Sequence, residues 1–118
     1  MSVERQKLVQ RYISRLQGSI RKAVADFLKR EEPQSLRFVR VGISPIQVGS
    51  LYKLSIKIYH SRPLKLDTIN ELVRRLRRNI QVTDWYIYAP HANAIRIETT
   101  ITIDILQGLI TSPGTFRI

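Results

Sequence analysis

The sequence predicts an α+β fold in which two helices cover one face of a four-stranded antiparallel sheet. Three observations support this prediction. Two segments carry apolar residues at a three-to-four residue spacing, four segments are rich in β-branched and aromatic residues, and together they follow the order α-β-β-α-β-β. Each helix has one apolar stripe and each clear strand one apolar side, so two layers bury them all. The expected architecture is a ferredoxin-like sandwich whose first strand has moved to the end.

The first helix is expected to begin with Ser2 as its N-cap and to end near Glu32. Pro33 stops it, because the residue before a proline disfavours the helical conformation. The apolar face consists of Leu8, Val9, Tyr12, Ile13, Leu16, Ile20, Val24 and Phe27. The opposite face is basic, with Lys7, Arg11, Arg15, Lys22 and Lys29. Because any solvated helix places its charges there, this stripe is weak evidence of function.

The next two segments are expected to form a hairpin. Leu36–Ile43 is rich in Val, Phe and Ile and predicts a strand, although the alternation leaves its inward side ambiguous. A turn lies between Ser44 and Ser50. Leu51–His60 is a clearer strand, in which the inward set Tyr52, Leu54, Ile56 and Ile58 alternates with Lys53, Ser55, Lys57 and Tyr59.

The second helix is expected to start at Asp67 or Thr68. Its apolar stripe is Ile69, Leu72, Val73 and Leu76, and four arginines project from the other side, namely Arg74, Arg75, Arg77 and Arg78. Glu71 is in position to pair with Arg74 or Arg75, which leaves three positive charges without a local partner.

The last two strands are expected at Val82–Ala89 and Ile95–Ile105, joined by a turn at residues 90–93. In the first of these, Trp85 and Ile87 are assigned inward and Tyr86 and Tyr88 outward. In the second, one side carries Ile95, Ile97, Thr99, Ile101, Ile103 and Ile105, and the other side carries Arg96, Glu98, Thr100, Thr102 and Asp104. Residues 1–106 are expected to form one domain. Residues 107–118 are expected to form a short tail, with Gly108, Pro113 and Gly114 as breakers, that lies along the body through Leu109, Ile110 and Phe116.

The charge of the chain is concentrated in its first two thirds. Residues 1–80 hold 18 of the 20 Lys and Arg residues but only 6 of the 9 Asp and Glu residues. A one-sided cationic field attracts polyanions whatever the fold beneath it. Arginine also predominates over lysine, 14 to 6, which favours bidentate contacts with phosphate. The leading expectation is therefore a nucleic-acid partner.

Two surfaces are candidates for this partner. The first is the arginine cluster of the second helix, Arg74, Arg75, Arg77 and Arg78. The second is the uncovered side of the sheet, which is expected to carry Lys53, Lys57, Tyr59, Tyr86, Tyr88 and Arg96. Aromatic rings among cations on an open sheet suit base stacking and phosphate binding, as in an RNA-recognition motif, although that module's aromatic signatures are absent from this sequence. The same residue types also suit a self-association surface.

Catalysis and metal binding have little support in the sequence. There is no cysteine, and the two histidines, His60 and His91, lie in separate segments. His60 is interpreted as a hydrogen-bonded residue at the sheet rim. The α-β-β-α-β order of elements resembles that of the cytoplasmic domains of cation-efflux transporters, but the metal-binding His and acidic residues expected of that group are missing. We therefore predict no enzyme activity, no metal and no cofactor.

The sequence therefore predicts a non-catalytic nucleic-acid-binding protein that contacts mainly the phosphate backbone of DNA or RNA, with weak sequence preference. A homo-oligomer is expected. No apolar run reaches the roughly 20 residues that span a bilayer, and no secretory signal is found, so no membrane contact is expected. The expected location is the cytoplasm, or the host-cell interior if the protein is viral. The alternative is an interaction subunit of a phage, viral or ribonucleoprotein assembly that binds an acidic protein surface.

Overall fold

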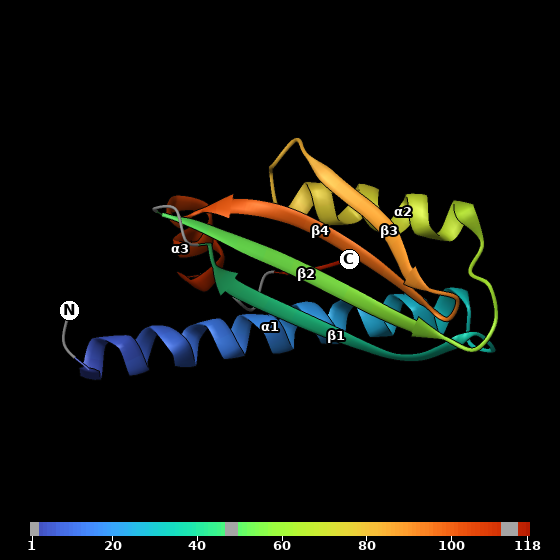
Figure 1. Cartoon of the computed structure of the whole chain (residues 1–118), viewed down its shortest axis with the longest axis horizontal. Coiled ribbons are helices and arrows are strands. Elements are labelled where there is room, and N and C mark those ends of the chain that lie inside the picture. Colours follow the sequence, from blue (N-terminus) through green and yellow to red (C-terminus); the bar gives the residue numbers. More distant parts are fainter. Residues whose placement is uncertain (1–2, 47–49, 112–115) are drawn as a thin grey trace.

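The computed structural model describes residues 3–46, 50–111 and 116–118, with the backbone alone for residues 3–6. It contains three helices and four strands in the order α1 (Val3–Glu31), β1 (Leu36–Pro45), β2 (Leu51–His60), α2 (Leu66–Asn79), β3 (Trp85–His91), β4 (Ala94–Thr102) and α3 (Ile103–Thr111). The strands form one antiparallel sheet in the order β1-β2-β4-β3 (Figure 1). The α+β class and the four-stranded antiparallel sheet are confirmed, whereas the predicted order with two helices lacked α3.

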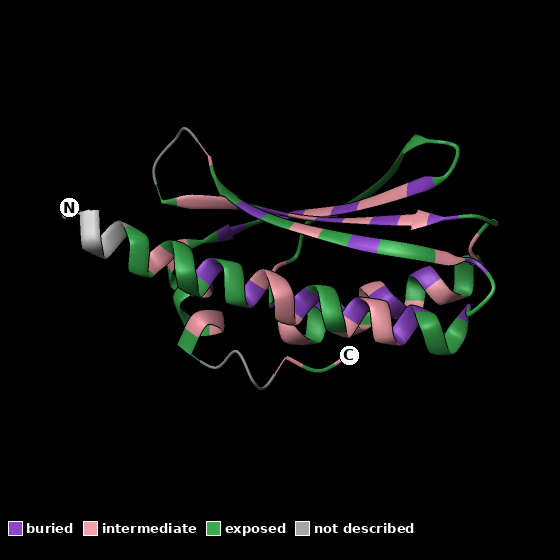
Figure 2. Cartoon of the chain, turned by 90° about the horizontal axis from the view of Figure 1, so that it is seen from below, coloured by how far each residue is buried: buried purple, intermediate pink, exposed green. Residues whose placement is uncertain are grey.

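The helices lie on one side of the sheet and leave its other side uncovered (Figure 2). Between the two layers is a core of aliphatic side chains and one phenylalanine. From the helices it includes Leu16, Ile20, Val24, Phe27, Leu72 and Leu76, and from the sheet Leu54, Ile56, Ile58, Ile97 and Ile101, all almost completely buried. The inward assignments in β2 and β4 are therefore confirmed for these residues, whereas Tyr52 and Ile95 are only half-buried.

The first turns of α1 extend past the end of the sheet (Figure 1). Two residues of the predicted apolar face, Leu8 and Tyr12, are consequently exposed, while the buried face begins at Ile13. The periodicity showed the side of the helix that is apolar, but not how far along the helix the sheet covers it. The predicted N-cap, Ser2, lies outside the described residues.

The second helix begins at Leu66, before the predicted Asp67 or Thr68. Its N-cap position, Lys65, makes no side-chain capping bond. Instead, the buried carboxylate of Glu32 accepts a hydrogen bond from the Lys65 N–H at 2.9 Å. An acidic group at a helix N-terminus stabilises it. The carboxylate that caps α2 therefore comes from the residue immediately after α1.

The C-terminal part of the chain differs most from the prediction. The strand expected to reach Ile105 ends at Thr102, and Ile103–Thr111 forms α3 where a strand end and a tail were predicted. The Thr102 hydroxyl accepts a hydrogen bond from the Ile105 N–H, as an N-cap does. Leu106 is buried, and Leu109, Ile110 and Phe116 pack against the core as expected. Pro113 and Gly114 lie outside the described residues.

Each edge strand contains one irregularity in its pairing. In β1, Leu36 pairs with His60 and Phe38 with Tyr59, so Arg37 is the extra residue of a β-bulge. This bulge resolves the ambiguous alternation of β1, because it lets both Leu36 and Val39 face the core while Phe38 faces outward. In β3 the register shifts between Tyr88 and His91, a segment that includes Pro90. A proline suits a bulge, since it has no N–H for the ladder.

Replacement of Leu72 by alanine should test the two-layer core. Leu72 is completely buried, so Leu72→Ala is expected to lower the free energy of unfolding by about 2–5 kcal/mol. Leu66→Ala, on the same helix at a side chain that is 73% exposed, should change it by less than about 0.5 kcal/mol. Urea denaturation followed by circular dichroism measures both. Equal losses would contradict the assignment of the α2 face.

Candidate nucleic-acid interface

The side of the sheet away from the helices, here called the open face, carries a row of three cations and one tyrosine across the four strands. The register pairs Arg40 on β1 with Lys57 on β2, and Lys57 with Arg96 on β4. Arg96 is in turn paired with Tyr88 on β3. Neighbouring strands are about 4.8 Å apart, so side chains aligned in this way are direct neighbours. We call these four residues the cation row.

A second row, made of rings, lies next to the cation row. Phe38 and Tyr59 are cross-strand partners, and their rings stack with centroids 4.2 Å apart and an interplanar angle of 19°. The His91 ring lies 6.1 Å from that of Tyr59, tilted by 44°. Between them stands Ala94, which pairs with both residues and is fully buried. Phe38, Tyr59 and His91 form the ring row.

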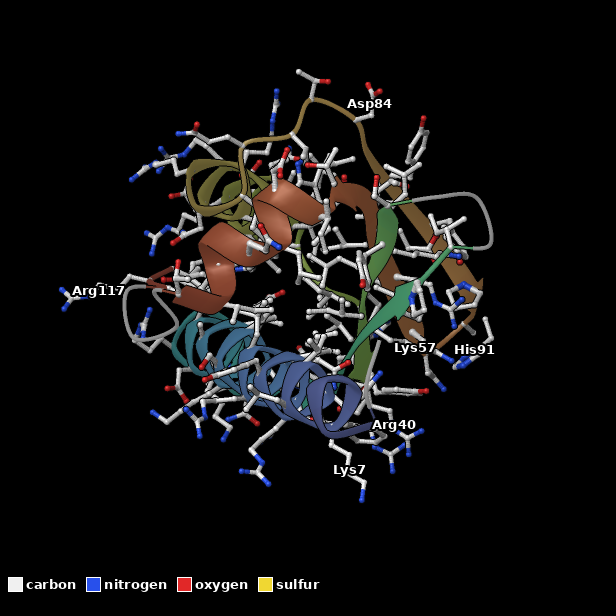
Figure 3. All side chains as sticks on the ribbon, turned by 90° about the vertical axis from the view of Figure 1, so that its left-hand side faces the viewer. Lys7, Arg40, Lys57, Asp84, His91 and Arg117 are labelled. Atoms are coloured by element: carbon white, nitrogen blue, oxygen red, sulfur yellow. The ribbon has the colours of Figure 1, made fainter. Side chains whose placement is uncertain are left out.

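Lys57 and His91 point away from the helix layer on the same side of the molecule (Figure 3). His91 comes from the end of β3, beside the turn at Ala92 and Asn93. The register shift in β3 makes His91 the partner of Ala94, whereas uninterrupted pairing would place Pro90 there. The bulge therefore puts an aromatic ring on the open face at the position that proline would otherwise occupy.

The cations Arg40 and Lys57 lie against the ring row. The Arg40 guanidinium is 5.6 Å from the centroid of Phe38 and 5.8 Å from that of Tyr59, and the Lys57 ammonium is 4.9 Å from Tyr59. These distances are those of cation–π contacts. Lys57 is also the main reason that the pKa of Tyr59 is lowered, with the charges of Arg40 and Arg96 acting in the same direction.

The other two predicted cations of this face, Lys53 and Arg96, share one carboxylate, which offsets part of their charge. Glu98 lies 3.5 Å from the Lys53 ammonium and 3.6 Å from the Arg96 guanidinium. The Tyr88 hydroxyl donates to Glu98 at 2.8 Å and accepts from Arg96 at 3.0 Å. The hydrogen bond between Arg96 and Tyr88 is the main cause of the raised pKa of Arg96. Arg40 and Lys57, by contrast, form no ion pair within the described part of the chain.

The two predicted aromatic residues of β3 are exposed, as expected. Tyr88 belongs to the cation row, and Tyr86, 64% exposed, pairs with Glu98 one row further along. Trp85 is half-buried, and its indole N–H donates to the Val82 carbonyl at 3.2 Å. Ile87 was assigned to the core but is 51% exposed. It pairs with buried Ile97, yet it lies on the edge strand, where the helix layer does not cover it.

The four arginines of α2 do not act as one free cluster. Glu71 pairs with Arg74 and also with Arg75, the latter at 2.8 Å, so two of the four arginines remain without an ion pair, while the five side chains together keep the expected three positive charges. The Arg75 guanidinium further lies 4.9 Å from the centroid of the Phe27 ring. Arg77 and Arg78 are exposed and make no ion pair with any residue that the structure describes.

A hollow at the end of α2 adds a further arginine. Its lining consists of Arg75, Arg78, Asn79, Arg117 and Ile118. Asn79 fixes this arrangement, because its side-chain amide donates to the Arg117 carbonyl at 2.6 Å while its oxygen accepts from the Arg117 N–H at 3.1 Å. The predicted site residues therefore fall on two separate surfaces, the open face and the helix layer.

Sequence reasoning missed Phe38, Arg40 and His91 on the open face and Arg117 beside α2. Phe38 and Arg40 are two residues apart and therefore lie on the same side of β1. The sequence alone did not show which side of β1 faces the core. His91 was assigned to a turn, and only the β3 register places it beside Tyr59. His60 is buried, and its ring Nδ1 lies 2.9 Å from the Arg62 carbonyl, which confirms the interpretation as a hydrogen-bonded histidine at the rim.

Comparisons of the chain with protein-family models, with curated proteins and with solved structures find no match. Within the described ranges, no group of three or more His, Asp or Glu side chains is arranged to hold a metal ion. None of the helices in those ranges combines the length and the apolar character needed to cross a membrane.

The pairing of Glu71 with two arginines predicts a pH-dependent contribution to stability. Arg74 and Arg75 lower the pKa of Glu71 to about 2 from an ordinary value of 4.5. Because the folded-state pKa is the lower one, the stabilisation is present above about pH 4.5 and is lost as the pH falls towards 2. Glu71→Gln should therefore be less stable than the native chain at neutral pH, and the difference should vanish near pH 2.

Urea midpoints of both proteins across this pH range measure the effect, which should be small for such an exposed group. Glu31→Gln, at an exposed position on α1, controls for the removal of one negative charge. A difference between the native chain and Glu71→Gln that persists unchanged at low pH would contradict the prediction.

Proposed function

We propose that this protein is a non-catalytic nucleic-acid-binding protein that contacts mainly the phosphate backbone and has weak sequence preference. One observation carries the proposal: Arg40 and Lys57 are neighbours on an uncovered sheet face, without an acidic partner among the described residues, and directly beside a row of rings. The net charge of +11 supports it by attracting polyanions from a distance.

The open face is the better supported of the two candidate surfaces. On α2, Glu71 already occupies Arg74 and Arg75, whereas on the open face a phosphate would meet two cations held in one place by adjacent strands. Lys53 and Arg96 would contribute less, since Glu98 offsets their charge. Arg77, Arg78 and Arg117 would provide a secondary contact on the helix layer.

The structure also supports a finer interpretation of the fold. An antiparallel sheet with the order β1-β2-β4-β3 is the arrangement obtained when the first strand of a ferredoxin-like sandwich moves to the end of the chain. On this interpretation α3 is an addition to the permuted sandwich. A fold shared by many proteins does not indicate a function, so the proposal rests on the open face itself.

Removal of Arg40 and Lys57 should weaken the binding of nucleic acid in a salt-dependent way. For labelled single- and double-stranded DNA and RNA, we expect affinity to fall as salt rises. In Arg40→Ala/Lys57→Ala the slope of log K against log salt should become shallower, by about 0.7 on single strands and about 0.9 on duplex DNA for each phosphate that is no longer neutralised. Fluorescence anisotropy over a series of salt concentrations measures both quantities.

The matched control is Arg11→Ala/Lys29→Ala, which removes one arginine and one lysine from exposed positions on α1. It lowers the net charge equally but leaves the open face intact, so its salt slope should stay near that of the native chain. Arg77→Ala/Arg78→Ala tests the helix layer in the same assay. Binding that ignores salt and all three variants would refute the proposal.

For the alternative function, a structural subunit that binds an acidic protein surface, one observation favours the self-association that such a subunit needs. The strand β3 is an edge strand without a single charged residue, and it exposes Tyr86, Ile87 and Tyr88. Uncharged exposed edges invite pairing with another strand. The Ile-rich strand β4, by contrast, is paired on both sides and offers no such edge.

We propose that β3 pairs with β3 of a second copy, so that the protein is a homo-oligomer. The other edge strand, β1, carries Arg37 and Arg40, which would face like charges in the corresponding β1 pair. Ile87→Lys should therefore convert an oligomer into a monomer in sedimentation velocity, while Arg37→Glu on β1 should not. A native chain that is monomeric at all concentrations would overturn this part. If a large oligomer forms and no nucleic acid binds, the structural function is favoured.

For the location we propose the cytoplasm, where nucleic acids are accessible to the protein.

A further inference from the structure

The ring row has features that the binding of phosphate does not require. Phosphate contacts need cations, yet the open face also places three rings side by side at one end of the sheet. Phe38 is 43% exposed, although a large apolar ring on a sheet surface gains more from burial. The register irregularities of both edge strands lie at this same end, around Arg37 on β1 and before His91 on β3.

These irregularities are informative because bulges often re-aim side chains next to functional sites. On β3 the shift gives the open-face position opposite Ala94 to His91, so that its ring comes within 6.1 Å of Tyr59. On β1 the bulge at Arg37 lets Leu36 return to the core without turning Phe38 inward. Both deviations from regular pairing thus maintain rings on either side of Tyr59.

The ring row and the cation row are also spaced to serve one ligand. Phe38 and Arg40, like Tyr59 and Lys57, are two residues apart on their strands, which corresponds to about 7 Å along the sheet. A nucleotide unit has a flat base at one end and a charged phosphate at the other. A base on the ring row would therefore leave its phosphate within reach of Arg40 and Lys57.

We propose that the open face binds unpaired nucleotides of a single strand, with bases stacked on Phe38 and His91 and phosphates held by Arg40 and Lys57. The inference rests on the proposed function and adds the class of nucleic acid. In a duplex the faces of the bases are already stacked on one another, so only a single strand offers them to protein rings. Stacking does not depend on the identity of the base, which agrees with weak sequence preference.

The cations that now lie over the rings have a part in this binding. Arg40 lies near the faces of Phe38 and Tyr59, and Lys57 near that of Tyr59. An arriving base displaces them from the rings, and the phosphate next to that base gives them a new partner. Tyr59 is half-buried beneath its neighbours, and we assign it the positioning of Phe38 rather than a separate stacking site.

The test separates stacking from charge. Anisotropy titrations use labelled oligonucleotides of about 12 nucleotides, namely single-stranded DNA, single-stranded RNA and the corresponding DNA duplex, over a series of salt concentrations that includes about 0.15 M. The native chain should prefer the single strands. Phe38→Ala should weaken single-strand binding by about 5- to 150-fold, the effect of removing the stacking of one base, with an unchanged slope of log K against log salt. His91→Ala should have an effect in the same direction.

Tyr12→Ala is the matched control, because it removes an exposed ring from α1 on the other layer and should leave binding unchanged. Phe38→Leu is the second variant, because it keeps an apolar side chain but removes the ring on which a base would stack. Circular dichroism shows whether each variant is folded. Arg40→Ala/Lys57→Ala should instead reduce the salt slope.

The outcomes distinguish the two proposals. If single strands and duplex bind equally, or if folded Phe38→Ala and Phe38→Leu bind like the native chain while Arg40→Ala/Lys57→Ala loses affinity, the single-strand inference is overturned and the proposed function stands. If no oligonucleotide binds, the proposed function itself fails.

Discussion

Antiparallel pairing of β2 with β4 aligns two sets of side chains at once. On the helix side it brings Ile56 beside Ile97 and Ile58 beside Ile95, and on the open face it brings Lys57 beside Arg96. Because the side-chain period of a strand is two, a slip of one residue would exchange these faces completely. The buried isoleucines therefore fix the cation row, and the position of the charges is set by the hydrophobic core beneath them.

A row of three cations on adjacent strands is unfavourable by itself, because like charges opposite one another destabilise a sheet. The open face offsets the cost in two ways. Glu98 and Tyr88 compensate Arg96, while Arg40 and Lys57 rest near the electron-rich faces of Phe38 and Tyr59. The side chain of Glu98 is only 14% exposed, and it holds Arg96 both directly and through the Tyr88 hydroxyl. The half of the row that lies against the rings is thus the half without a carboxylate partner among the described residues.

The elements whose pattern alone determines their environment were predicted well. The stripe of α2 and the alternation of β2 and β4 identified Leu72, Ile56 and Ile97 as core residues. The failures come from tertiary context. Thr102 continues the alternation of β4, yet its hydroxyl caps a helix. The positions of Lys57 and Arg96 on the open face followed from the alternation of their strands. The positions of Arg40 and His91 depend on how β1 and β3 pair with their neighbours. The bulges in these two strands interrupt the alternation, and no sequence pattern marks them.

The contact between Asn79 and Arg117 depends less on ionic strength than the ion pairs on the surface do. The Asn79 amide bonds both the N–H and the carbonyl of Arg117, and it also donates to the Arg75 carbonyl at 2.9 Å. An amide carries no charge, so added ions do not screen these bonds, while they do screen the mutual repulsion of the neighbouring arginines. High ionic strength therefore leaves residues 116–118 docked against α2.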